Sequence, residues 1–440
     1  MDSMLIIDEV RLTPILISDP PLLNVQGVHQ PYTPRLIVEV ITRAGTTGLG
    51  ETYGDRVYLD LARPLADALP GHPVTDVNAL FELAGVGRPA AGERNAGASS
   101  SPPHAPVTEA GVDAAGLRGV RTADKLRLSV VSAFETACLD ALGKTLGLPV
   151  HALLGGKVRD SVEYSAYLFH RWAAHPGDGP TDDWGAALDP AGVVAQARRF
   201  DRLHGFRSFK LKGGVFPPEQ EIATIRALAE AFPGRPLRLD PNGAWSVDTS
   251  LAVAHELRDV LEYLEDPASG TDAMAEIAAR TDVPLATNMC VTTFEEIPEA
   301  FAEDAVRIVL CDHHYWGGLH RTRELAALCR TYGIGLSMHS NTHLGISLAA
   351  MTQVAATLPE LHHACDTHYP WQTEDVVTPR PVFRAGRIPV SDAPGLGVQL
   401  DRRALAALHR RWLTADVALR DRDDTATILS THPTWTPPHW

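Results

Sequence analysis

Chemically reactive side chains recur at a regular interval from residue 210 onward. Each one ends or follows a short apolar run, and together they are Lys210, Lys212, Asp240, Glu265, Asn288, Asp312, His339, Asp366 and His368. From Lys212 to Asp366 the successive steps are 23 to 28 residues long, about the length of one strand and one helix. Parallel strands of a barrel present their carboxyl ends at one face, so the spacing predicts a single shared site.

Three of these side chains are oxygen donors from consecutive strand-helix units, namely Asp240, Glu265 and Asn288. Hard oxygen ligands with few nitrogens or thiols suit Mg²⁺, which keeps some coordination positions for water or substrate. A single Asp or Asn at the end of a strand is often only a helix cap or a turn residue. Three such residues in consecutive strand-helix units favour a metal site over separate caps or turns.

Two lysines, Lys210 and Lys212, stand two residues apart in one apolar strand. Side chains alternate along a strand, so both ammonium groups should enter the same space. Repulsion between like charges lowers the pKa of an amine toward the range of a general base. An unpaired buried lysine is too costly to keep without a function, so we interpret this pair as catalytic.

A second candidate base is His339, with Asp312 at the end of the preceding strand. A carboxylate beside an imidazole fixes the ring tautomer and raises its basicity. A metal flanked by two bases suits removal of the proton next to a carboxylate, because the ene-diolate charge then needs immediate neutralisation.

The elements that must position these residues follow a strand-helix rhythm. The expected strands are 162–170, 206–212, 237–240, 261–265, 284–288, 307–312, 335–339 and 363–368. Apolar residues between them recur in steps of three and four, which is typical of helices. The fold class predicted is therefore an α/β barrel, a TIM-like (β/α)₈ arrangement.

A barrel uses only about 250 residues, so a chain of 440 needs a second domain. Residues 35–42 and 47–52 predict a hairpin, and Val131, Phe134 and Cys138 lie on one face of a helix that should end before Gly147. Residues 85–119 are rich in Gly, Ala, Ser and Pro, which predicts a flexible insertion.

Composition excludes several function classes. A net charge of −15 disfavours nucleic acid and anionic membranes as partners. No apolar run approaches the roughly 20 residues that span a bilayer, and the first residues do not form a secretion signal, so we expect a cytoplasmic protein. The five cysteines form no Cys-x-x-Cys pair and mostly stand in apolar runs, so we expect buried reduced thiols.

At this point the chain resembles the acid-sugar dehydratases of the enolase superfamily, in particular the glucarate dehydratase group. The motifs that carry the resemblance are Lys210-Leu211-Lys212-Gly213-Gly214, Asp240-Pro241-Asn242-Gly243, Glu265-Asp266-Pro267, Thr287-Asn288, His339-Ser340-Asn341-Thr342-His343 and Asp366-Thr367-His368, with Asn24 to His29 near the start. Asn288, where many relatives have a carboxylate, points to the glucarate group.

The resemblance implies an α+β capping domain over residues 1–150, a barrel over 151–395, and a segment 396–440 that returns to the cap. It implies Mg²⁺ as the cofactor and a small diacid sugar as the substrate, and we expect a homo-oligomer. The substrate-binding residues that it implies are Asn24, His29, Tyr167, Asn242, Ser340, Asn341, His368 and Arg422. Arg422 suits a carboxylate because guanidinium binds it in bidentate fashion.

The resemblance implies separate catalytic roles for residues on two walls of the barrel. Lys212 or His339 removes the proton next to the metal-bound carboxylate, depending on its configuration, and the β-hydroxyl leaves as water with His339 as the acid. Lys210 binds the carboxylate and tunes Lys212, and Asp312 orients His339. The product is a 5-keto-4-deoxy sugar diacid.

Two segments depart from the family pattern. The segment after Glu265-Asp266-Pro267 is short, which makes Glu265 the metal ligand to check first, and Cys311-Asp312-His313-His314-Tyr315-Trp316 lacks a usual proline. Dehydration of another acid sugar and a catalytically silent paralogue remain alternatives. A metal-dependent hydrolase, suggested by nineteen histidines, is disfavoured because the first barrel strand lacks a His-x-His motif.

Overall fold

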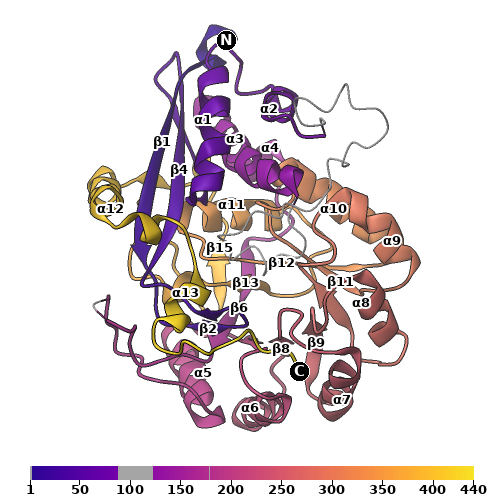
Figure 1. Cartoon of the computed structure of the whole chain (residues 1–440). Coiled ribbons are helices and arrows are strands. Elements are labelled where there is room, and N and C mark those ends of the chain that lie inside the picture. The colour runs from indigo at the N-terminus through magenta and orange to yellow at the C-terminus, as the bar shows by residue number, and fades with distance from the viewer. Residues whose placement is uncertain (1, 88–121, 178) are drawn as a thin grey trace, which may run out of the picture.

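The computed structural model describes residues 2–87, 122–177 and 179–440. The insertion predicted over 85–119 lies almost wholly outside the described residues and stays a prediction. The described chain forms a barrel with a second layer of antiparallel strands and helices packed over it (Figure 1). Within the described ranges, no helix combines the length and apolar character needed to cross a membrane.

The eight predicted barrel strands are confirmed, with ends that differ by at most three residues. They are β6 (Ser161–Phe169), β7 (Phe209–Lys212), β8 (Leu237–Asp240), β9 (Leu261–Glu265), β10 (Leu285–Thr287), β11 (Ile308–Cys311), β12 (Gly335–Met338) and β13 (Cys365–Thr367). They pair in parallel in chain order, and β13 returns to pair with β6. The barrel is thus nearly closed, and the strand ends that carry the reactive side chains meet at one mouth.

Helices between these strands cover the outside of the barrel (Figure 1). They are α5 (Pro190–His204), α6 (Pro218–Ala231), α7 (Val247–Leu257), α8 (Thr271–Ala278), α9 (Ile297–Ala302), α10 (Leu319–Tyr332) and α11 (Gly345–Ala355). Local chemistry sets their ends: the Asp189 side chain accepts the Gly192 N–H at the start of α5, and Gly205 ends that helix in the left-handed conformation.

The capping layer is built on a three-stranded antiparallel sheet of order β1-β4-β5. Its elements are β1 (Ile7–Ser18), β4 (Tyr32–Thr42), β5 (Thr47–Tyr53), α1 (Arg56–Ala68), α2 (Val77–Ala84) and α3 (Ala123–Leu146), joined to α4 (Val150–Leu153). The predicted hairpin is β4-β5, and the predicted helix is α3, which ends at a left-handed Gly147. Both predictions are confirmed.

The last part of the chain returns to the cap and to the barrel mouth. Helix α12 (Arg402–Thr414) packs on β1, where the His409 ring donates to the Pro14 carbonyl at 2.7 Å. Helix α13 (Asp424–Leu429) packs on the small hairpin of β2 (Leu23–Asn24) and β3 (Gly27–Val28). Three short strands lie near the end of the chain, namely β14 (Val377–Thr378), β15 (Arg387–Pro389) and β16 (Gln399–Leu400), and the 3-10 helices are η1 (Asp2–Leu5), η4 (Phe294–Glu296), η5 (Tyr369–Trp371) and η6 (Val417–Arg420).

A buried carboxylate of the cap, held by an ion pair, joins the cap to the barrel. Arg35 of β4 and Glu51 of β5 lie 2.6 Å apart and are both fully buried. Glu51 also accepts the backbone N–H groups of Leu344 and Ser347 at 2.9 Å each, at the start of barrel helix α11. A carboxylate at a helix N-terminus is stabilised by the unpaired N–H groups there, so this contact fixes the cap relative to the loop that carries His339.

The five cysteines are all unpaired and four of them are buried, as the sequence predicted. Burial raises the pKa of the Cys138 thiol to about 12, so this thiol stays protonated at neutral pH.

The glycines of β5 explain how helix α3 reaches the sheet. A Cβ on Gly50 would lie 1.9 Å from the Ala133 carbonyl oxygen, and one on Gly48 would lie 1.9 Å from the Ala137 carbonyl oxygen. The helix backbone therefore rests directly on the strand, which only glycine permits.

Replacing Gly50 by Ala should destabilise the fold by about 2 to 3 kcal/mol, because the added methyl group forces α3 away from β5. Calorimetric unfolding measures the effect. The matched control is Gly71→Ala, where the φ angle is +96° but nothing lies within 4 Å of the added Cβ. Alanine at Gly71 meets backbone strain without a clash, so it measures the first effect alone, and a Gly50→Ala protein as stable as the wild type would contradict the steric explanation.

Candidate active site

A small cavity of about 20 Å³ lies at the barrel mouth, enclosed by the cap, the barrel and the tail. It is lined by Asn24, His29, Tyr167, Phe169, Lys212, Tyr315, His339, Asn341, His368 and Arg422. Both candidate bases and six of the eight predicted substrate-binding residues are among them. Segments almost 400 residues apart in the chain therefore meet at one point.

Lys210 occupies the centre of the barrel beneath this cavity. Its ammonium nitrogen lies 2.5 Å from Glu265, 2.7 Å from Asp366 and 3.1 Å from Asp240. Burial alone would lower the pKa of Lys210, but the carboxylates outweigh it and raise the pKa well above its ordinary value. The prediction that lysine-lysine repulsion lowers this pKa was wrong for Lys210, because three acids that are distant in sequence surround it.

Lys212 points into the cavity and is held by Asp240. Its nitrogen donates to the Asp240 carboxylate at 2.8 Å, and the same carboxylate oxygen accepts the Tyr167 hydroxyl at 3.0 Å. Burial opposes ionisation of Asp240, but Lys212 and Lys210 outweigh it and hold the pKa of this carboxyl below its usual range. Asp240 is therefore ionised and orders two cavity-lining side chains.

The three predicted metal ligands lie at the ends of adjacent strands. Asn288 donates its amide N–H to Glu265 Oε1 at 2.8 Å. Glu265 Oε2 and Asn288 Oδ1 are buried and have no hydrogen-bond partner among the described residues. Burial, and then the nearby Asp240, raises the pKa of Glu265 well above its ordinary value. Unsatisfied oxygens and crowded acids are what a hard divalent cation relieves, so these residues fit Mg²⁺.

Asp266 supports this group and was not among the predicted site residues. Its carboxylate accepts the Thr287 hydroxyl at 2.5 Å and the Asn288 backbone N–H at 2.8 Å. Its φ angle of 37° lies in the left-handed region. Burial raises the pKa of Asp266 to about 7. Its place in the motif Glu265-Asp266-Pro267 was the sequence feature that could have identified it as a site residue.

The second candidate base, His339, lines the same cavity as Lys212 and follows β12, which does not neighbour β7 in the barrel. Its Nδ1 lies 3.2 Å from Asp312 Oδ2, so the predicted pair is brought together. Burial lowers the pKa of His339, and the opposing effect of Asp312 is smaller. Asp312 raises the basicity of the ring, as predicted, but desolvation of the imidazole outweighs this effect, so the net pKa is lowered.

The cap and the tail supply the remaining wall. Arg422 pairs side-on with Asp424, with both N···O distances 3.2 Å, and Asn24 donates to the same Asp424 at 2.8 Å. His29 lies 3.2 Å from Asp19. The guanidinium group of Arg422, which was predicted to bind a substrate carboxylate, is thus partly occupied by the carboxylate of Asp424.

Two of the predicted substrate-binding residues do not line the cavity, and two residues that line it were not predicted. Asn242 donates its backbone N–H to Asp240 at 3.1 Å and has a φ angle of 53°, and Ser340 is fully buried beside His339 in sequence. The missed residues are Phe169, which ends β6, and Tyr315, whose ring lies 5.6 Å from that of His339. The available signal in the sequence was the position of Phe169 at a strand end and of Tyr315 in the segment that follows β11.

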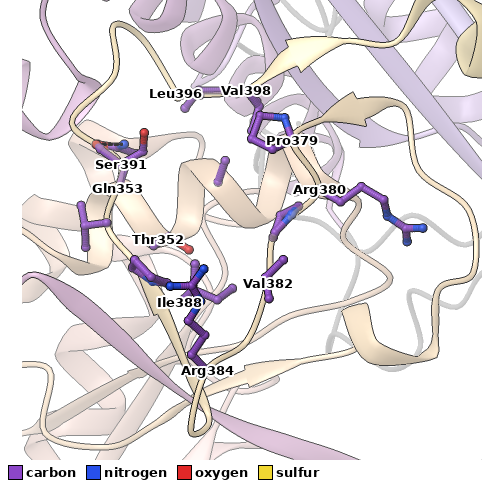
Figure 2. Close-up of a pocket in the computed structure, with 15 residues that line it drawn as sticks. Thr352, Gln353, Pro379, Arg380, Val382, Arg384, Ile388, Ser391, Leu396 and Val398 are labelled. Carbon is purple, nitrogen blue, oxygen red and sulfur yellow. Dashed lines mark hydrogen bonds between the residues drawn. The ribbon is translucent and has the colours of Figure 1, made fainter. Parts of the chain in front are cut away.

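A larger cavity of about 390 Å³ lies elsewhere, between α11 and residues 379–398 (Figure 2). Apolar side chains such as Val382, Ile388 and Val398 dominate its wall, and Thr352 and Gln353 face it from the helix. None of the predicted catalytic or substrate-binding residues lines it. Chemistry rather than size therefore locates the candidate active site at the barrel mouth.

Comparisons with known proteins identify the family of the chain. Residues 192–404 match the family described as enolase C-terminal domain-like. The chain is 69% identical over 440 residues to a probable glucarate dehydratase of Streptomyces coelicolor, covering 100% of this chain and 99% of that one. It is also 26% identical over 387 residues to a D-xylonate dehydratase of Haloferax volcanii, with 85% of each chain covered.

Solved structures show the same architecture. An enolase of Thermobispora bispora, complexed with magnesium and formate, superimposes with a TM-score of 0.91 at 52% identity, covering 99% of both chains. An enolase of Pseudomonas fluorescens, with bound magnesium, potassium and tartrate, gives a TM-score of 0.90 at 45% identity over 99% of both chains.

Replacing Lys210 by Met should cost about 3 to 5 kcal/mol of stability, because it leaves buried carboxylates without their cation. Without this cation the pKa values of those carboxyl groups rise in the folded state. A carboxyl group whose pKa is raised on folding contributes stability at low pH, and that contribution is lost as the pH rises. The variant should therefore melt at a higher temperature at pH 5 than at pH 8 in a chelator-containing buffer, as measured by calorimetry.

The matched control is Lys157→Met, which removes an ion pair with the largely exposed Asp392. An exposed pair contributes at most about 1 kcal/mol, so this variant should melt close to the wild type at both pH values. A Lys210→Met protein as stable as the control would refute the charge-balance argument.

Proposed function

The chain belongs to the enolase superfamily as a glucarate dehydratase-like hydro-lyase, and on that premise we propose that it dehydrates D-glucarate to 5-keto-4-deoxy-D-glucarate. The observation that carries the proposal is the pair of candidate bases, Lys212 and His339, that face one cavity across the barrel. A dehydratase that accepts either configuration at the acidic carbon needs a base on each side.

The superfamily depends on Mg²⁺, and the chain offers a matching ligand set. Asp240, Glu265 and Asn288 would hold the ion, since two of them carry buried oxygens without a described partner. When bound, Mg²⁺ supplies positive charge that stabilises the electron density gained by the substrate carboxylate as its neighbouring proton leaves.

The side chains of the protein perform the proton transfers. The neutral form of Lys212 or His339 removes the proton next to the carboxylate, and the lowered pKa of His339 keeps its ring free to accept it at neutral pH. When His339 takes the proton, the imidazolium that results donates it to the departing β-hydroxyl, which leaves as water; when Lys212 takes the proton, His339 serves as the acid only in its protonated form. The enol then becomes a ketone. Lys210 stays charged and balances the acids around the carboxylate.

A second candidate function is dehydration of a monoacid sugar. Asp424 already neutralises Arg422, so the far end of the cavity does not carry a free excess of positive charge. The similarity to a D-xylonate dehydratase supports the same alternative. A neutral hydroxymethyl group would need no charge there. The cytoplasmic location and the homo-oligomeric state stay predictions.

The direct test incubates the protein and Mg²⁺ with a panel of hexarates and aldonates and measures 2-keto acid formation. Product from D-glucarate supports the leading proposal. Product from an aldonate alone would replace it by the monoacid alternative and keep the chemistry. No product from any acid sugar would refute both.

The two-base scheme predicts separate losses in Lys212→Ala and His339→Asn. Each variant should lose turnover by about 10² to 10⁴-fold, the usual contribution of a general base. In D₂O each should still exchange the acidic proton of the one epimer that the remaining base can reach. Mass spectrometry of recovered substrate measures the exchange, and exchange of both epimers by both variants would contradict the scheme.

Arg422→Gln should raise KM for a diacid by about 10 to 100-fold, the loss expected for charged hydrogen bonds to a carboxylate. The KM for an aldonate of equal length serves as the internal control and should change little. Equal effects on both substrates would show that Arg422 is structural and does not read the distal charge.

A further inference from the structure

His314 lies behind the His339 base and is fully buried. Its Nδ1 and its backbone N–H both lie 2.9 Å from Asp312 Oδ1. Its Nε2 lies 2.9 Å from the Glu51 carbonyl oxygen and 3.0 Å from the Ser347 hydroxyl. One ring therefore connects the carboxylate that orients His339 to the cap strand β5.

The partners on the two sides of this ring decide where its protons are. Burial opposes ionisation of Asp312, but His314 and His343 outweigh it and lower the pKa of this carboxyl well below its usual value, so Asp312 is an acceptor. The Glu51 carbonyl is an acceptor as well. Both ring nitrogens of His314 thus face hydrogen-bond acceptors at 2.9 Å.

Neither neutral tautomer satisfies this arrangement. A ring protonated only on Nδ1 would turn its Nε2 lone pair toward the carbonyl oxygen, and a Ser347 hydroxyl donating to Nε2 would not remove that repulsion. A ring protonated only on Nε2 would turn its Nδ1 lone pair toward an ionised carboxylate, which is worse. Only the doubly protonated ring donates on both sides.

We propose that His314 is a standing imidazolium, that it is the counter-ion of Asp312, and that it acts as a positioning residue which keeps the His339 ring oriented and uncharged. One buried negative charge is then balanced by one buried positive charge. Asp312 still accepts from His339 Nδ1 and fixes its tautomer, but little of its charge is left to draw a second proton onto that ring.

The neighbouring histidines do not compete for this role. His343 Nε2 lies 3.5 Å from Asp312 Oδ2, and its other ring nitrogen has no described hydrogen-bond partner. Burial lowers the pKa of His343 to about 4, and it lowers that of His313 well below the ordinary value. Among the described imidazoles around Asp312, only His314 has an acceptor on each side.

Other charged and titratable groups also face this pair of rings. Those near His314 are Asp312, His313, His343, Glu51, Tyr53 and Arg35, and those near His339 are Asp312, Lys210, Asp366, Tyr315 and His368. Arg35 is paired with the Glu51 carboxylate at 2.6 Å, so its charge is already balanced and does not replace that of His314.

The protonation state is tested without any substrate. Side-chain ¹⁵N NMR of the full-length protein, labelled on its histidines, is recorded at pH 8, where exposed histidines have lost their second ring proton. We expect one histidine with two protonated nitrogens, and its signals should vanish in His314→Asn. A single protonated nitrogen on His314 would overturn the proposal, whatever the protein catalyses.

The positioning role rests on the proposed function and has its own test. His314→Asn keeps a donor for Asp312 but removes the charge, so the acidic limb of kcat/KM for the His339-dependent epimer should move up by about one pH unit. The acidic limb of kcat/KM for the Lys212-dependent epimer should not shift. The matched control is His343→Asn, which removes a neutral ring from the same carboxylate and should not move the limb.

The outcomes separate the claims. A folded His314→Asn enzyme with an unshifted acidic limb, or with the same shift for both epimers, would overturn the positioning role while the NMR result stands. A protein that turns over no acid sugar refutes the proposed function alone, because the ring protonation is measured independently.

Discussion

The burial of Lys210 is the constraint on which the rest of the site depends. A charged ammonium group cannot lie in a barrel core without compensation, and here Asp240, Glu265 and Asp366 supply it from three strands. The same acids then cannot all be ionised at close range without further positive charge. The need for a divalent cation and the placement of Lys212 beside Asp240 both follow from this balance.

The two candidate bases are held by different kinds of partner. Lys212 donates to Asp240, one of the proposed metal ligands, whereas His339 contacts Asp312, whose proposed counter-ion is His314. One candidate base is therefore coupled to the proposed metal site and the other to the contact between barrel and cap. This division gives each side of the substrate its own electrostatic control.

The capping layer forms part of the candidate active site and does not merely cover it. Glu51 ties the start of α11 to β5, and its carbonyl oxygen receives the His314 ring. Asn24 and Arg422 converge on Asp424, although they stand almost 400 residues apart in the chain. Neither domain alone would form the cavity, so a substrate bound there would contact both.

By itself, the sequence determined the eight strands, their order and the residues that end them, because apolar periodicity and spacing are local properties. It also brought Asp240, Glu265 and Asn288 to one mouth, since parallel strands leave no other arrangement. Only the tertiary structure decided the protonation of the site. The pKa of Lys210 rises and that of His339 falls because buried neighbours distant in sequence set the local charge and solvation, and a linear pattern does not contain either.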